Sequence, residues 1–342
     1  MNDYNLETPY IPDEVRISRG RYNYSAVSFC LFAFGIIAIA IQTLFIYILA
    51  AIANHYPQII DASWLNYILI LVPMYCIAFP LCILSFKLVP KAPPRDEKLS
   101  FGSLISYFVM MVPVTLILNY LSIVLAAVLS DGSATNPLND IVSDVNIWQI
   151  LTVVILGPIV EETIFRKLII DRTRQFGEAL SIIFSALCFG LFHTNVYQLF
   201  YASALGLLLG YIYTRTGRIR YSIILHIAFN FWGSVIPLKM AEFINEDLLN
   251  KISENAANLQ DVLTNSELIS ISIYFIYIFI ELGMFIAGII LWIIFISTKK
   301  FRLHPAPMEL PKGSRFKTAF INLGFMFFFA YCIYGTIKAF LN

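Results

Sequence analysis

Three charged residues end an otherwise apolar stretch of the chain. Glu161, Glu162 and Arg166 follow the nearly unbroken apolar run 150–160. A charged side chain costs at least about 2.5–3.5 kcal/mol near the centre of a membrane helix, so residues of this kind are candidates for function. The i, i+4 spacing of Glu162 and Arg166 places them on one helix face and predicts an ion pair. Glu161 faces another direction, so the sequence predicts one neutralised carboxylate and one that is available for chemistry.

Two histidines and an asparagine add polar groups to apolar segments further along the chain. His193 ends the segment CFGLFHTN, and His226 and Asn230 lie four residues apart in YSIILHIAFNFWGS, on one helix face. Each of them alone is most simply a hydrogen-bonded residue inside a helical bundle. Together with Glu161 they supply a base, groups that orient it and donors for an oxyanion. This is the set of groups needed to add water to an amide carbonyl.

The composition indicates that membrane helices position these residues. Of the 342 residues, 59% are hydrophobic and only 13% are charged, and the mean hydropathy is +0.76. A soluble domain carries about 25% charged residues. The net charge of +1 leaves no basic excess with which to bind a nucleic acid. We therefore expect an all-α, polytopic membrane helical bundle whose partner is the lipid bilayer and not a nucleic acid.

Apolar runs of about 20 residues, the length that crosses a bilayer, define the expected spans. We predict about nine of them, at residues 26–53, 64–86, 101–129, 147–165, 178–194, 197–213, 221–238, 268–298 and 318–341. If the N-terminus is cytoplasmic, twenty of the 23 Lys and Arg residues fall on the cytoplasmic side, as the positive-inside rule requires. The C-terminus is then outside, and the compact chain with short loops favours a bacterial plasma membrane.

This layout predicts four regions and several local features. The regions are a cytoplasmic tail at 1–25, N-terminal membrane helices at 26–145, a catalytic core at 146–240, and an outer loop with C-terminal helices at 241–342. The Pro-rich, charged segments 87–100 and 299–317 predict extended cytoplasmic connections. His193 would lie too far toward the outer side if the fourth helix ended at 165. We therefore expect this helix to continue past Arg174.

Small residues predict two further features of the core. Gly157-Pro158 predicts a kink just before Glu161. Ala202, Gly206 and Gly210 form a small-residue stripe that predicts a close helix contact. Glu281 is the single acidic residue inside the eighth predicted span. We expect it to be hydrogen-bonded or to contact a partner, and not to be catalytic.

Three motifs resemble those of a known family. EETIFR at 161–166, FGLFH at 189–193 and HIAFN at 226–230 are similar to the EExxxR, FxxxH and HxxxN/D motifs of the CAAX-processing and bacteriocin-processing (CPBP) intramembrane protease family. The resemblance covers roughly residues 146–240. It implies an intramembrane endopeptidase that hydrolyses a membrane-associated peptide or protein, of the CAAX, bacteriocin or signalling-peptide type.

The resemblance also implies a role for each residue of the motifs. It assigns Glu161 to polarising a water molecule and His193 to holding that water. His226 and Asn230 would stabilise the oxyanion. Glu162 and Arg166 would form a structural ion pair, and Phe189 would serve packing.

The sequence leaves the metal and the function class open. Glu161, His193 and His226 could hold zinc with an open position for water, but the chain lacks HExxH, and we favour a glutamate-dependent mechanism. One alternative function is a non-proteolytic membrane immunity or regulatory protein on the same fold. Another is a transporter with a Glu/His proton relay, although no inverted repeat supports it.

Overall fold

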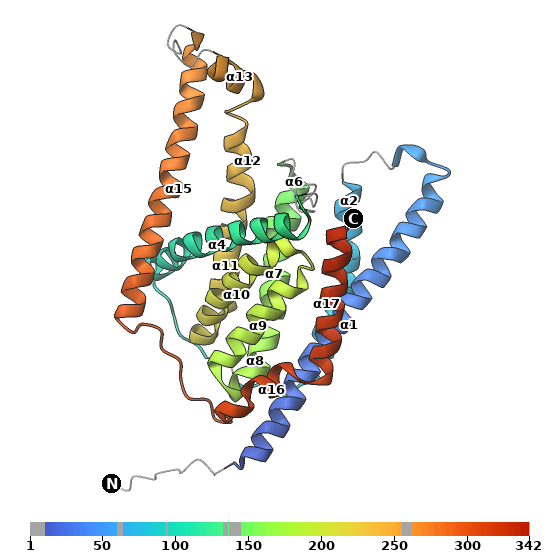
Figure 1. The fold of residues 1–342 in the computed structure, drawn as a ribbon. Coiled ribbons are helices and arrows are strands. Elements are labelled where there is room, and N and C mark those ends of the chain that lie inside the picture. The colour runs from blue at the N-terminus through green and yellow to red at the C-terminus, as the bar shows by residue number, and fades with distance from the viewer. Residues whose placement is uncertain are drawn as a thin grey trace.

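The computed structural model describes residues 11–59, 64–93, 95–132, 136, 145–254 and 262–341. The part of the predicted tail before residue 11 lies outside the described residues. The described part of the chain is an all-α bundle without strands, and eight of its helices are long and apolar enough to cross a membrane. The fifth predicted span, at 178–194, is a shorter apolar helix of 15 residues. The prediction of a polytopic helical membrane protein is therefore confirmed (Figure 1).

The N-terminal part of the bundle contains two long helices, α1 and α4, and between them a span made of three consecutive helical segments. These elements are α1 (Asp13–Ala53), the 3-10 turn η1 (Pro57–Ile59), α2 (Leu65–Ile70), the π-helical η2 (Leu71–Ala78), α3 (Phe79–Phe86) and α4 (Phe101–Leu129). The segments α2, η2 and α3 form a continuous span at Tyr67–Phe86.

The fourth span is one helix of changing type. It consists of α6 (Ile147–Gln149), the π-helical η3 (Ile150–Leu156), α7 (Gly157–Glu162), the π-helical η4 (Thr163–Leu168), α8 (Ile169–Thr173) and the 3-10 turn η5 (Arg174–Phe176). The change from π- to α-helix falls at the predicted break at Gly157-Pro158. The span ends at Phe176, which confirms that the helix is longer than hydropathy indicates. Gly177 then makes the turn into the next helix with φ 134°, a value that favours glycine.

The remaining helices complete the core and its two sides. They are α9 (Glu178–Phe192), α10 (Val196–Thr216), α11 (Ile219–Asn230), the π-helical η6 (Phe231–Val235), α12 (Ile236–Ala241), α13 (Glu246–Glu254), α15 (Asn265–Ser297), the 3-10 turn η7 (Lys312–Ser314), α16 (Arg315–Phe320) and α17 (Leu323–Leu341). The span predicted at 318–341 is thus divided, because the helix breaks between Phe320 and Leu323.

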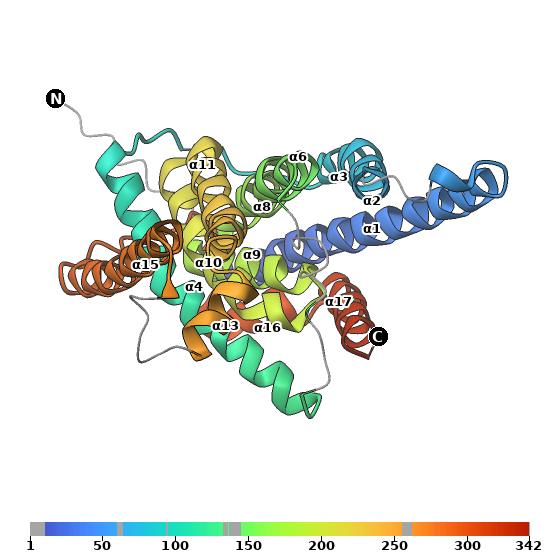
Figure 2. The same cartoon turned by 90° about the horizontal axis from the view of Figure 1, so that it is seen from above.

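The core helices lie between two flanking groups. Helix α10 packs against α9, α4 and α11, while α15 packs on α4, and α1 packs on α17 (Figures 1 and 2). The predicted small-residue stripe is where α10 meets α9, because a Cβ at Gly206 would lie 3.0 Å from the Cα of Ala186. On the α9 side, a Cβ at Gly190 would lie 2.0 Å from Ser203 Oγ. These small residues bring the helix that ends at His193 close to α10.

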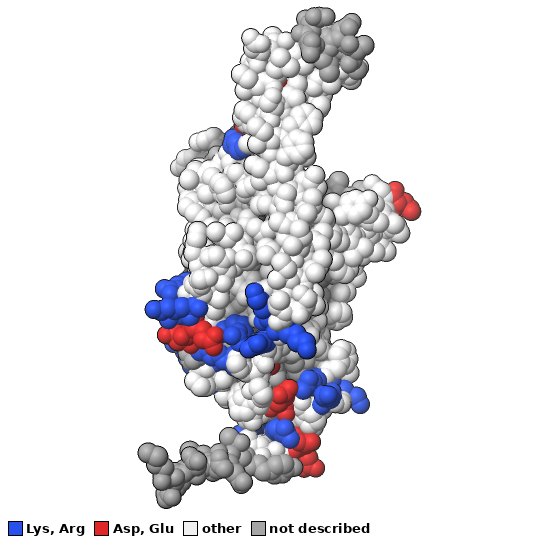
Figure 3. Space-filling view, turned by 90° about the vertical axis from the view of Figure 1, so that its left-hand side faces the viewer, with Lys and Arg blue, Asp and Glu red and all other residues white. Residues whose placement is uncertain are grey.

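One end of the molecule is rich in Lys and Arg, and we call it the basic end (Figure 3). Both predicted connections cross this end and are held by backbone hydrogen bonds. Ala92 N donates to Asp171 O over 2.7 Å, and Leu310 N donates to Phe176 O over 3.1 Å. Glu178, at the start of α9, pairs with Arg95 and accepts from His304 N. The connections therefore fix the turn between the fourth span and α9.

Candidate active site

The buried ion pair lies at the centre of the polar cluster. Arg166 Nε lies 3.1 Å from Glu162 Oε2, and both side chains are 0% exposed, which is the pair that their spacing predicts. Arg166 Nη1 also donates to Ser185 Oγ over 3.1 Å, and its guanidinium carbon lies 4.8 Å from the centre of the Phe189 ring. Helix α9 therefore contacts the fourth span through both a hydrogen bond and a cation–π contact.

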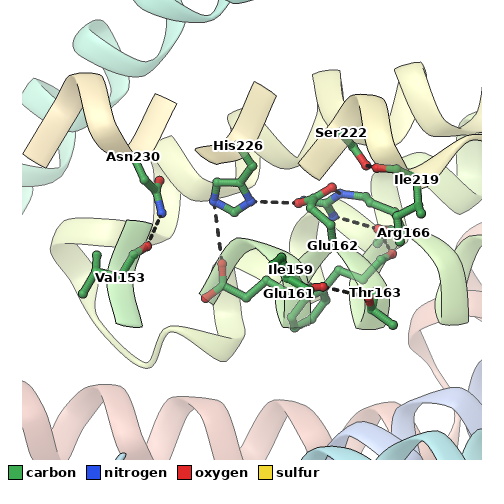
Figure 4. Close-up of polar contacts among 12 residues, drawn as sticks. Val153, Ile159, Glu161, Glu162, Thr163, Arg166, Ile219, Ser222, His226 and Asn230 are labelled. Carbon is green, nitrogen blue, oxygen red and sulfur yellow. Dashed lines mark hydrogen bonds and ion pairs between the residues drawn. The ribbon is translucent and has the colours of Figure 1, made fainter. Parts of the chain in front are cut away.

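His226 lies between the two neighbouring carboxylates (Figure 4). Its Nδ1 is 3.0 Å from Glu162 Oε1, and its Nε2 is 3.7 Å from Glu161 Oε2. Because an ionised carboxylate only accepts hydrogen bonds, Nδ1 carries the hydrogen that Glu162 accepts. This contact fixes the orientation of the ring, and Nε2 points toward Glu161.

The two glutamates differ in exposure. The Glu161 side chain is 23% exposed, whereas that of Glu162 is fully buried. Among the described residues, Glu161 has no charged partner within hydrogen-bond distance, and the 3.7 Å to His226 Nε2 is longer than a hydrogen bond. Glu161 is therefore the carboxylate that can accept a proton from a molecule in the accessible space.

His193 lies directly after α9 and packs beside His226 through a shared aromatic ring. The centre of the Phe189 ring is 4.9 Å from that of His193 and 5.7 Å from that of His226, and both contacts are edge-on. His193 also interacts electrostatically with Glu161. The motif phenylalanine therefore packs as the resemblance implies, and the three motifs meet in one cluster.

Asn230 makes a contact that the sequence does not reveal. Its Nδ2 donates to the carbonyl oxygen of Val153 over 2.9 Å. In a π-helix a carbonyl accepts from the N–H five residues on, as Thr152 does from Gly157. The corresponding residue for Val153 is Pro158, which has no N–H. One amide hydrogen of Asn230 therefore satisfies a carbonyl that the proline leaves free.

A second intramembrane carboxylate lies outside this cluster. Glu281, on α15, accepts from Trp232 Nε1 over 2.6 Å and from Tyr277 Oη over 3.3 Å. Trp232 lies in η6, two residues after Asn230. Glu281 is hydrogen-bonded, as expected, and connects α15 to the helix that carries His226.

The predicted zinc ligands are not grouped as a metal site. Among the described residues, no group of three or more His, Cys, Asp and Glu side chains is placed to hold a metal ion. His226 directs Nδ1 to Glu162, so Nε2 would be its ligand atom. Zinc bound by Glu161, His193 and His226 stays a prediction, and none of the chemistry below depends on a metal.

Sequence reasoning missed residues that lack a motif. Ser185 contacts Arg166 only because α9 packs against the fourth span, and Tyr75 approaches Glu161 from the second span. The π-helical segments η3, η4 and η6 contain or adjoin the motif residues outside α9. π-Helical segments occur frequently at functional sites, but only one of them is marked in the sequence, by Gly157-Pro158.

Comparisons with known proteins agree with this geometry. A sequence model of the family described as "Type II CAAX prenyl endopeptidase Rce1-like" matches residues 143–232. The chain is also 26% identical over 137 residues to "Putative membrane peptidase YdiL" of Bacillus subtilis (strain 168), an alignment that covers 39% of this chain and 52% of that protein. The chain thus matches about half the length of this curated relative. No solved structure matches.

The matched segment contains all three motifs around Glu161. The family match and the relative both support a likeness of this segment to the CPBP family of membrane proteases.

Proposed function

We propose that the protein is an intramembrane endopeptidase in which Glu161 activates a water molecule. The observation that carries this proposal is the difference between two adjacent carboxylates that flank one imidazole. Glu162 is buried and paired with Arg166, whereas Glu161 is partly exposed and pairs with no Lys or Arg in the described part of the chain. A partly exposed carboxylate beside an oriented histidine has the geometry of a general base.

The reaction proceeds in two steps. Glu161 accepts a proton from water while the water oxygen bonds to the carbonyl carbon of the substrate, and the carbonyl oxygen becomes an oxyanion. The C–N bond then breaks, its electron pair goes to nitrogen, and Glu161 returns the proton to that nitrogen. The products are a carboxylic acid and an amine. His193 holds the water, and His226 with Asn230 lies on the side of the oxyanion.

The substrate is a peptide or protein associated with the membrane, of the CAAX, bacteriocin or signalling-peptide type. The matching family, described as a CAAX prenyl endopeptidase, supports this class. The basic end faces the cytoplasm of a bacterial cell, which places the N-terminus inside and the C-terminus outside. The gathering of Lys and Arg at one end supports this orientation.

Peptide cleavage by the purified protein tests this proposal. Mass spectrometry of membrane-associated peptides should show a new pair of termini with wild-type protein and none with Glu161→Gln. Glu281→Gln is the matched control, because it removes an intramembrane carboxylate outside the cluster, and it should still cleave. A chelator should leave the rate unchanged, whereas loss of cleavage would favour a metal. A strain that lacks the gene gives the phenotype to be complemented. If both Glu161→Gln and His193→Ala restore that strain to wild type, the non-proteolytic regulatory function is correct.

A further inference from the structure

Tyr75 brings a hydroxyl group to the site from outside the three motifs. It lies in the π-helical segment η2 of the second span, whereas the family match begins at residue 143. Its position follows from the glycine that precedes Pro158. A Cβ at Gly157 would lie 3.5 Å from Tyr75 Oη and 3.9 Å from Glu161 Oε1. The hydroxyl and the carboxylate therefore face the same space, which stays open because residue 157 has no side chain.

Tyr75 and His226 both lie near the Glu161 carboxylate. The position that a Cβ at Gly157 would take is near both Tyr75 Oη and Glu161 Oε1, and His226 Nε2 is 3.7 Å from Glu161 Oε2. Glu161 is also the charged group with which Tyr75 interacts. The carboxylate thus has both an imidazole and a phenol near it.

The Tyr75 hydroxyl is available as a donor. It forms no hydrogen bond with another residue in the part of the chain that the structure describes. Asn230, by contrast, has already committed one amide hydrogen to Val153. An uncommitted donor beside the general base is what a developing oxyanion needs.

We propose that Tyr75 is a further catalytic residue, whose hydroxyl donates a hydrogen bond to the carbonyl oxygen of the substrate as it becomes an oxyanion. This inference rests on the proposed peptidase function. Water held by Glu161 attacks the carbonyl carbon, and the Tyr75 hydroxyl adds a donor from the second span to those of His226 and Asn230 around the oxyanion. The phenol keeps its proton throughout, so no bond of Tyr75 breaks. Gly157 serves this arrangement by leaving room for the substrate group between the two spans.

The test compares Tyr75→Phe with Tyr67→Phe in peptide cleavage. Both variants remove one hydroxyl from the second span. The Tyr67 hydroxyl, however, accepts a hydrogen bond from Asn146 and is not part of the cluster. Loss of one oxyanion donor typically lowers kcat about 10²–10³-fold. We expect a fall of this size for Tyr75→Phe with little change in KM, and wild-type kinetics for Tyr67→Phe.

A second replacement keeps the shape of the side chain. With 3-fluorotyrosine at position 75 the phenol is more acidic, so the rate should begin to fall at a lower alkaline pH than in wild type, which a packing role would not cause. If Tyr75→Phe keeps full kcat, or if fluorination leaves the pH profile unchanged, this inference is wrong while the peptidase function stands. If the wild-type protein cleaves nothing, the proposed function fails and the inference fails with it.

Discussion

The buried pair between Glu162 and Arg166 makes the stability of the core unusually sensitive to one substitution. Arg166→Met removes the guanidinium but keeps much of its volume. The Glu162 carboxylate, 0% exposed, then keeps only neutral partners, among them His226 and Ser222. We expect this variant to be strongly destabilised, because it leaves a charge buried without its cation.

The magnitude follows from the burial of both partners. Removing one member of a fully buried ion pair costs about 3–5 kcal/mol. At about 1.4 kcal/mol per factor of ten, the opened state becomes roughly two to three and a half powers of ten more populated. Replacing both partners, as in Glu162→Gln with Arg166→Met, removes both charges and should restore most of the stability. It should not restore full activity, because His226 then donates to a neutral amide.

Thiol labelling in detergent measures this effect. Four cysteines are buried, namely Cys30, Cys82, Cys188 and Cys332, while Cys76 is exposed. In a Cys76→Ser background, labelling reports opening of the core, and the rate should rise by the factor above in Arg166→Met. Lys239→Met is the matched control, because its pair with Glu242 is 44% and 62% exposed and such pairs contribute little.

Two outcomes would refute this reasoning. The first is an Arg166→Met protein that is labelled as slowly as the wild type, which would mean that the carboxylate is hydrated. The second is a double variant that is as unstable as the sum of the two single variants, which would mean that the residues do not interact.

Two more predictions concern hydrogen bonds inside the bilayer. Asn230→Leu leaves the Val153 carbonyl without a donor, which should lower the stability by about 1–3 kcal/mol and speed thiol labelling. Pro158→Ala in that background returns an N–H and should slow the labelling again. If it does not, Val153 is not the partner that matters. Trp232→Phe removes the 2.6 Å donor to Glu281 and should raise the labelling rate. Adding Glu281→Leu to that variant should return the rate toward wild type. If the single and the double variant are labelled at equal rates, the contact is not needed.

The fold class and the cluster could be predicted because their signals are local. Glu162 and Arg166 meet through helical spacing alone, and each motif places its residues within two turns of a helix. The apolar runs predict the spans, since length and hydropathy decide whether a helix can cross a membrane.

The remaining features depend on contacts between distant segments. Hydropathy ends the fourth helix too early, because Asp171 and Arg172 are charged yet buried through contacts with Tyr213 and the Phe86 carbonyl. The partner of Asn230 is a backbone atom, for which no sequence pattern exists. The approach of Tyr75 to Glu161 depends on how the second and fourth spans pack, which no motif records.

The most direct test of the central claim is a single-turnover cleavage in H₂¹⁸O. If Glu161 activates water, the new carboxyl terminus carries one ¹⁸O in the first turnover, Glu161 itself carries none, and Glu161→Gln gives no product. A first product without label, labelled Glu161, or full cleavage by Glu161→Gln would contradict the proposal that this carboxylate delivers water to the peptide bond.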